Sequence, residues 1–201
     1  MTSASSKNSP TLTSNRLILR RFVPEDTAAL LRLLQDPEVN TFLPWSPLQT
    51  MEQAAQFLQQ RYLDSYSQPV GYRYAICLKE DTTPIGYINV GEAPSYDLGY
   101  GLCREYWHQG IVSEAAACLL QHLRQQQTIP YLTATHDVNN PHSGDVMKKI
   151  GMHYCYSYRE QWQPKDISVV FRMYQCNLDG ASHPVYREYW DRYPHWIEKL
   201  S

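Results

Sequence analysis

The feature that most constrains this chain is an apolar segment followed by a short loop with one glycine and then a strongly helical pattern. Residues 96–103 are typical of a strand, Gly110 lies in the loop, and the helical pattern covers residues 111–127. The first N–H groups of a helix lack intrahelical partners, and the helix dipole adds partial positive charge there. This order of elements predicts a site that binds a phosphate-bearing ligand through backbone N–H groups.

Two familiar phosphate-binding motifs do not fit this stretch. A Walker A loop needs G-x-x-x-x-G-K-[ST], which the sequence lacks. A dinucleotide fingerprint needs G-x-G-x-x-G, and Gly99-Tyr100-Gly101 is not followed by a third glycine at that spacing. A single glycine is also typical of an ordinary helix start, so this stretch alone leaves both interpretations open.

The rest of the sequence alternates predicted strands and helices. Strands are expected at residues 12–22, 72–78, 85–90, 96–103, 131–135, 152–162 and 167–178. Helices are expected to begin at Pro24, Thr50, Ile111 and Asn140, and the last of them to be closed by Gly151. The strands that flank the helix at 111–127 should run parallel through a right-handed crossover. The prediction is an α/β (α+β) domain with a mixed, largely antiparallel sheet, a central β-loop-α-β unit and helices on both faces.

Charge and cysteine usage argue against several classes of protein. A net charge of −2 over 201 residues disfavours a nucleic-acid-binding surface. Five cysteines without a C-x-x-C pair predict free thiols and a reducing compartment. No apolar run is long enough to span a membrane, and no His/Cys spacing matches a zinc site. We therefore expect a cytoplasmic protein with no metal and with neither a nucleic acid nor a membrane as partner.

Three segments resemble motifs of the GNAT N-acetyltransferases. The acetyl-CoA-binding motif of that family is similar to residues 98–102 (LGYGL) and 106–115 (YWHQGIVSEA). Its N-x-x-S…K-x-G-[FM] helix resembles residues 137–152 (DVNNPHSGDVMKKIGM). The opening residues 13–20 (TSNRLILR) resemble the start of the ribosomal-protein alanine N-acetyltransferase branch. The resemblance covers about residues 12–178 and implies a GNAT fold that uses acetyl-CoA as cosubstrate.

The resemblance also implies which residues bind acetyl-CoA. In that family the loop cradles the CoA pyrophosphate through backbone N–H groups, and the preceding strand hydrogen-bonds the pantetheine arm. The cofactor-binding residues expected here are Leu102, Cys103, His108, Gln109, Gly110, Ile111, Val112, Ser113, Asn140 and Ser143. Trp107 replaces the usual Gln or Arg, and Val112 stands where a small residue is common. A valine crowds a close backbone approach, so the pyrophosphate site is expected to be looser.

Acetyl transfer needs a proton donor for the departing thiolate. Many family members have a Tyr seven residues after the helix Asn, but here Met147 occupies that position and cannot donate a proton. The resemblance to the ribosomal branch implies that Ser143 is the acid. A helix-capping role for Ser143 is an equally good interpretation of the sequence.

The transfer also needs a base that deprotonates the amine. Glu160 is the first candidate, because it lies on a late strand near the position at which the resemblance to the ribosomal branch implies a Glu. Glu92, which ends the strand before the one expected to bind CoA, is the second. Asp97 and the pair His136 and Asp137 are further candidates. For each carboxylate the alternative is a solvated surface position, since most carboxylates are exposed.

The sequence divides into a polar tail at residues 1–10, a GNAT domain at 11–180 and an aromatic C-terminal extension at 181–201. In one strand the spacing of Tyr154, Tyr156, Tyr158 and Trp162 predicts a single aromatic face. The extension is expected to pack back on the domain, to cover the active site or to mediate a homodimer. The pattern does not separate these three.

The expected activity is transfer of acetyl from acetyl-CoA to a primary amine by direct nucleophilic attack. The acceptor is either a protein N-terminus or a small-molecule amine, because fold does not fix substrate. The alternative classes are a non-catalytic acyl-CoA sensor, suggested by Met147 and Val112, and a protein-interaction module that uses the aromatic extension.

Overall fold

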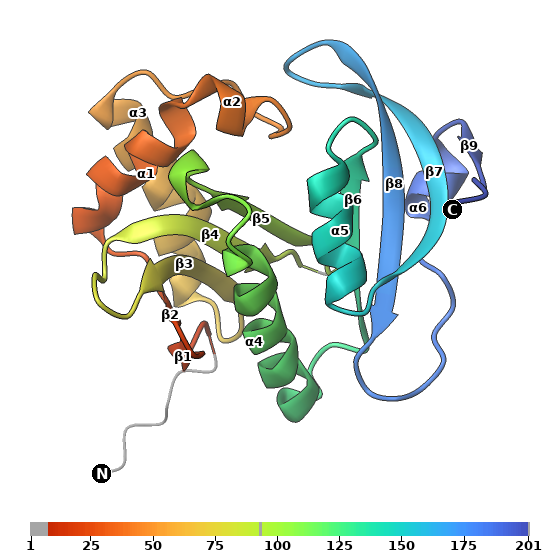
Figure 1. Ribbon diagram of the computed structural model, residues 1–201, viewed down its shortest axis with the longest axis horizontal. Helices are drawn as coiled ribbons and strands as arrows, with labels where there is room; N and C mark the ends of the chain where they lie inside the picture. Colours follow the sequence, from red (N-terminus) through yellow and green to blue (C-terminus); the bar gives the residue numbers. More distant parts are fainter. Residues whose placement is uncertain (1–7, 93, 201) are drawn as a thin grey trace. The chain divides into compact units, whose positions relative to one another are not determined.

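The computed structural model describes residues 8–92 and 94–200, and Figure 1 shows the order of their helices and strands. The strands are β1 (Leu12–Thr13), β2 (Leu17–Arg20), β3 (Tyr72–Leu78), β4 (Pro84–Val90), β5 (Leu98–Leu102), β6 (Tyr131–Asp137), β7 (His153–Trp162), β8 (Ile167–Asn177) and β9 (His195–Trp196). The α-helices are α1 (Thr27–Gln35), α2 (Pro37–Asn40), α3 (Met51–Leu58), α4 (Ile111–Gln126), α5 (Pro141–Lys149) and α6 (Glu188–Arg192). Short helical turns are η1 (Pro24–Asp26), η2 (Gln59–Leu63), η3 (Asp64–Ser67) and η4 (Arg104–Tyr106).

The chain forms two compact units. The first comprises the described residues of Met1–Thr41 with Pro47–Val90 and Gly99–Leu119. The second comprises those of Phe42–Ser46, Gly91–Leu98 and Leu120–Ser201. The mixed α/β composition predicted from the sequence is confirmed in both units.

The first unit is built on a sheet with the strand order β1-β2-β3-β4-β5. Strands β1 to β4 pair antiparallel, and α1 packs on β4. The expected strand at 12–22 is instead a hairpin of β1 and β2, because Ser14 N donates to Leu17 O at 3.0 Å and turns the chain. The predicted cap of α3 is confirmed, since the Thr50 side chain accepts from Gln53 N.

The second unit is built on an antiparallel sheet with the order β6-β8-β7-β9. Helix α5 packs against β6 (Figure 1). Its predicted N-cap is Asn140, and Gly151 follows its C-cap with φ of +86°, as expected for a closing glycine. Strand β9 belongs to the C-terminal extension, which therefore packs back on the domain.

The single sheet expected from the sequence is two sheets. The predicted parallel pairing around α4 is reduced to one bridge between Asp97 and Thr133, in the second unit. The turn before β5 is fastened to β6 by side chains, because Tyr131 Oη donates to Pro94 O at 2.8 Å and Thr133 Oγ1 donates to Ser95 O at 2.9 Å. These bonds hold residues 94–97 beside β6 without a regular ladder.

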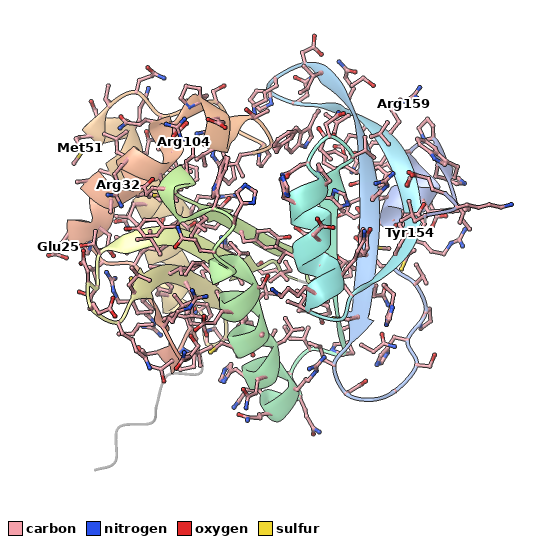
Figure 2. The ribbon with its side chains drawn as sticks, in the orientation of Figure 1. Glu25, Arg32, Met51, Arg104, Tyr154 and Arg159 are labelled. Atoms are coloured by element: carbon pink, nitrogen blue, oxygen red, sulfur yellow. The ribbon has the colours of Figure 1, made fainter. Side chains whose placement is uncertain are left out.

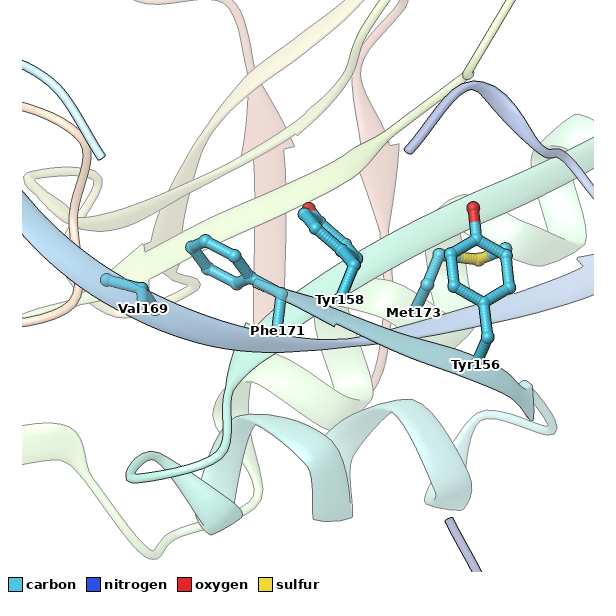
Figure 3. Close-up of a cluster of buried hydrophobic side chains, with 5 residues drawn as sticks. All are labelled: Tyr156, Tyr158, Val169, Phe171 and Met173. Atoms are coloured by element: carbon cyan, nitrogen blue, oxygen red, sulfur yellow. The ribbon is translucent and has the colours of Figure 1, made fainter. Parts of the chain in front are cut away.

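The prediction that Tyr154 shares a face with Tyr156 and Tyr158 is wrong. The register shifts between Tyr154, opposite Tyr174, and Tyr156, opposite Met173, so a β-bulge puts Tyr154 on the other face. Figure 3 shows the face that remains, on which Tyr156, Tyr158, Val169, Phe171 and Met173 are buried together. We call this the aromatic face of the second unit.

Candidate functional site

The predicted phosphate loop lies between β5 and α4, in the first unit. Trp107 Nε1 donates to Leu102 O at 2.8 Å and ties the loop to the end of the strand. His108 and Gly110 have φ of +58° and +73°, left-handed conformations that turn the backbone into the helix. The first intrahelical bond is from Glu114 N to Gly110 O at 3.0 Å, so the N–H groups of residues 111–113 precede the bonded ladder. This geometry suits an anion.

The side chains of the loop divide into buried and exposed sets. Leu102, Cys103 and Ile111 are buried, and Cys103 N donates to Ile85 O at 2.8 Å. His108 and Gln109 are exposed, whereas Val112 and Ser113 are half-buried. Any contribution of the buried residues to ligand binding therefore comes from the backbone.

The two glycines of β5 have different surroundings. A Cβ on Gly101 would lie 2.5 Å from Tyr87 Cε1, and a Cβ on Gly86 would lie 2.4 Å from Gly101 O. A Cβ on Gly99 would meet no atom of the described chain within 4 Å. Gly101 therefore allows β4 and β5 to approach closely. This packing role explains why a glycine is present at a position that belongs to no dinucleotide-binding motif.

A hydrogen-bond network around Glu114 holds the loop in place. Glu114 Oε1 accepts from Ser14 Oγ at 2.7 Å and from Arg16 N at 2.8 Å, and Oε2 accepts from Arg16 Nε at 2.7 Å. Arg16 Nη2 donates in turn to Gln109 O at 3.1 Å. Partial burial opposes ionisation, but the bonds from Arg16 and Ser14 hold the pKa of Glu114 below its usual value. Sequence reasoning missed this role, because only proximity in the fold reveals it.

The basic residue that follows β5 is engaged elsewhere in the first unit. Arg104 Nη1 lies 2.8 Å from Glu38 Oε2, and its Nε lies 3.6 Å from Asp36 Oδ2. Arg32, labelled with Arg104 in Figure 2, pairs with Glu105 at 3.8 Å. An anion at this loop would therefore bind the backbone N–H groups and the partial positive charge of the helix dipole.

In the second unit the structure brings Asn140 and Ser143 together. Asn140 Oδ1 accepts from Ser143 N at 3.4 Å, so the side-chain cap of α5 is supplied by Asn140. Ser143 is half-buried in the first turn of the helix. Met147 is buried with 1% of its surface exposed, so it is a core residue.

The candidate bases have different environments in the second unit. Glu92 is exposed, whereas Glu160 is half-buried on the same face of β7 as Tyr158. His136 is buried against Gly144, where a Cβ would lie 2.5 Å from its Nε2, and burial lowers the pKa of His136. The carboxylate of the neighbouring Asp137 accepts a hydrogen bond from Asn139 N at 2.8 Å, so it stabilises the turn that follows β6.

Asp97 is the most perturbed of these carboxylates. Its Oδ1 is shielded from solvent and accepts no hydrogen bond from the described residues. Burial raises the pKa of Asp97 to about 6, because a carboxylate loses hydration in this position. Asp97 also raises the pKa values of Tyr158 and Tyr189, after the larger effect of burial on each. The sequence offered Asp97 only as a lower-ranked candidate, because its burial depends on residues far away in the chain.

All five cysteines are free, as predicted. No helix of residues 8–92 and 94–200 is long and apolar enough to cross a membrane. Within the described part of the chain, no group of three or more His, Cys, Asp or Glu side chains is arranged to hold a metal ion.

Comparison with known proteins gives consistent results. The profile of the acetyltransferase (GNAT) domain matches residues 16–153. The uncharacterized N-acetyltransferase YnaD of Bacillus subtilis is 28% identical over 145 residues, 70% of this chain and 81% of that protein. A GNAT acetyltransferase of Bacillus anthracis has a TM-score of 0.72 at 21% identity, covering 84% of this chain and 99% of that one. The ribosomal alpha-N-protein acetyltransferase RimL, in complex with coenzyme A, has a TM-score of 0.74 at 18% identity, covering 85% and 99%.

Proposed function

This chain belongs to the GNAT acetyltransferase family, and from this premise we propose that it transfers acetyl from acetyl-CoA to a primary amine by direct nucleophilic attack. The acceptor classes are a protein N-terminus and a small-molecule amine. The observation that carries the proposal is the half-buried Asp97, whose Oδ1 is shielded from solvent and accepts no hydrogen bond from the described residues, and whose pKa is raised by burial to about 6. A base with a pKa near the working pH is what proton removal from an amine requires.

Acetyl-CoA binds, in this proposal, at the loop that leads into α4. The backbone at Gly110, Ile111, Val112 and Ser113 holds the pyrophosphate, with His108 and Gln109 shaping the loop. The early N–H groups of a 16-residue helix and the left-handed turn at Gly110 support this assignment. The coenzyme A bound to the structural neighbour RimL supports the choice of ligand.

The remaining cofactor contacts are proposed from the sequence motifs. The backbone of Leu102 and Cys103 hydrogen-bonds the pantetheine arm, and Asn140 with Ser143 contributes from the start of α5. Donors aimed at the thioester carbonyl stabilise the negative charge that develops on its oxygen. The catalytic domain is proposed to comprise residues 11–180.

The chemical step follows from the proposed roles. The amine nitrogen attacks the acetyl carbonyl carbon, a C–N bond forms, the C–S bond breaks, and the ammonium proton passes to Asp97. The departing thiolate takes a proton from the Ser143 hydroxyl, because the side chain of Met147 carries none. The proton gained by Asp97 then returns through solvent to the Ser143 oxygen, which restores both groups. The products are an acetamide and the free thiol of CoA.

Turnover with a panel of primary amines, followed by release of the CoA thiol, tests the proposal. We expect acetylation that falls on the order of a hundredfold or more in Asp97→Asn, which keeps the shape but cannot accept a proton. Glu80→Gln, at an exposed turn between β3 and β4, is the matched control and should retain full activity. Tight acetyl-CoA binding without turnover of any amine would identify an acyl-CoA sensor instead.

A further inference from the structure

The last two strands of the sheet in the first unit, β4 and β5, are neighbours (Figure 1). Cys103 N donates to Ile85 O at 2.8 Å, and a Cβ on Gly101 would lie 2.5 Å from Tyr87 Cε1. Residue numbers therefore fall along β5 as they rise along β4. The two strands pair antiparallel, and residues on them are opposite each other at steps of two.

The next step of two residues places Asn89 of β4 directly opposite Gly99 of β5. One step further on, Gly91 N donates to Asp97 O at 2.7 Å, which agrees with this register. Opposite residues of an antiparallel pair have their Cβ positions on the same face of the sheet. A Cβ on Gly99 would meet no atom within 4 Å apart from its chain neighbours. The missing side chain of Gly99 therefore leaves open space on the face that carries the Asn89 carboxamide.

The Asn89 carboxamide is bonded through its nitrogen alone. Asn89 Nδ2 donates to Tyr62 Oη at 3.4 Å, and Tyr62 belongs to η2, a π-helical turn that follows α3. Such turns are frequent at functional sites. Asn89 Oδ1 is shielded from solvent and accepts no hydrogen bond from the described residues. A buried amide oxygen without a donor is costly, so a ligand that supplies this donor would gain from binding here.

Two arginines set the charge around this carboxamide. Arg73 of β3 is directly opposite Asn89 across the β3–β4 pair, so its Cβ lies on the same face. Arg61 precedes Tyr62 in η2. Burial raises the pKa of Tyr62 to about 12, whereas the charges of Arg61 and Arg73 oppose this shift. A second ammonium on the acceptor would be repelled by these charges, and a neutral hydrogen-bond donor would not.

We infer that Asn89, held by Tyr62 on the face left open at Gly99, is a specificity-determining residue that binds a neutral amide next to the reacting amine of the acceptor. This inference rests on the proposed function and narrows its acceptor to α-amino amides. A carboxamide has one acceptor oxygen and two N–H donors in a plane, which complements another amide. The acceptor N–H donates to Asn89 Oδ1, and the second N–H of Nδ2 donates to the acceptor carbonyl. The proposed base Asp97 precedes Gly99 by two residues, a span of at most about 7 Å.

A matched pair of acceptors tests the substrate class. Alaninamide and alanine methyl ester share the amine and the carbonyl, but only the amide has an N–H next to that carbonyl. We expect kcat/KM for alaninamide to exceed that for the ester by about tenfold or more, which corresponds to about 1.4 kcal/mol. Asn89→Leu should reduce this ratio to about one. Gln56→Leu, which replaces an exposed carboxamide of α3, is the matched control and should leave the ratio unchanged. Equal rates with both acceptors in the wild type, or an unchanged ratio in Asn89→Leu, would overturn the inference.

A substitution at Gly99 tests the binding position without disturbing the fold. Gly99→Ala puts a methyl group into open space, so the melting temperature should not fall. The variant should lower kcat/KM for alaninamide about tenfold. Calorimetry should show an unchanged affinity for acetyl-CoA. An unchanged kcat/KM would contradict the inference, and so would a loss of acetyl-CoA affinity, because it would assign the space to the cofactor.

Tyr62 is a positioning residue, because it acts on the acceptor through the Asn89 carboxamide. Tyr62→Phe keeps the ring, whose centroid lies 4.4 Å from that of Phe22, and removes only the hydroxyl. The variant should raise the KM for alaninamide about threefold to tenfold and leave kcat/KM for the ester unchanged. A purely structural role would affect both acceptors equally, and that result would exclude Tyr62 as a positioning residue.

Two sources of the amide can be separated with the same assay. A higher kcat/KM for the tripeptide alanyl-glycyl-glycine than for alaninamide would identify a peptide N-terminus, and the reverse a free amino-acid amide; either result agrees with the inference. Turnover of simple amines or diamines as fast as that of the amide would overturn the amide site and leave the proposed function intact. Acetyl-CoA binding without turnover of any amine would overturn both.

Discussion

Replacing Asp97 by asparagine should make the protein more stable while it removes activity. The carboxyl has an ordinary pKa of 3.8 and a pKa of about 6 in the folded protein. The folded state therefore holds its proton more tightly than the unfolded state, and stability falls as pH rises from about 4 through 6. At about 1.36 kcal/mol for each tenfold change in proton affinity, the difference between 3.8 and about 6 gives a penalty of about 3 kcal/mol above pH 6.

Asparagine cannot ionise, so Asp97→Asn removes this penalty and leaves only the cost of burying an amide. Urea unfolding at pH 7.5 should show a gain approaching about 3 kcal/mol in the free energy of unfolding, and at pH 4 the gain should vanish. The exposed Glu80→Gln should change neither value. No gain at pH 7.5, or a gain equally large at pH 4, would refute the argument that Asp97 is desolvated in the fold.

Other predictions follow from the same geometry. The wild-type kcat/KM should fall below about pH 6 as Asp97 is protonated. Asp97→Asn should lose this acidic limb of the pH–rate profile, and Glu160→Gln should keep it. The opposite result would identify Glu160 as the base. Glu114→Gln should weaken acetyl-CoA binding roughly threefold to tenfold in calorimetry, because it loosens Arg16 behind the loop, and unchanged affinity would remove this supporting role. Ser143→Ala should lower kcat about tenfold with little loss of acetyl-CoA affinity; an equal loss in both, or none, would exclude Ser143 as the acid.

The parts of the fold that local chemistry decides could be predicted from the sequence. The loop into α4 depends on Gly110 and on an apolar spacing that begins at Ile111, and the structure has both. The capping residues Thr50 and Asn140 act within three residues of their own position. Gly151 adopts positive φ, as a closing glycine should. Such signals need no knowledge of distant contacts.

Features that depend on distant strands could not be predicted. The bulge that places Tyr154 on the other face depends on the pairing of β7 with β8. No residue near Cys155 predicts it. The strand β9 has two residues, too few for a periodic pattern. The environment that raises the pKa of Asp97 depends on the fold, and the carboxylate in turn raises the pKa of Tyr158 and Tyr189, both more than sixty residues away. The proposal that Asp97 is the base therefore could not be made from the sequence alone.

Calorimetric titration of the purified protein with acetyl-CoA, repeated with Gly110→Glu, tests the central claim most directly. The variant combines a strained residue at φ of +73° with a negative charge at the helix start. Micromolar binding by the wild type that is lost in the variant would agree with a pyrophosphate held on this loop. Absence of binding by the wild type, or equal binding by both proteins, would contradict the account.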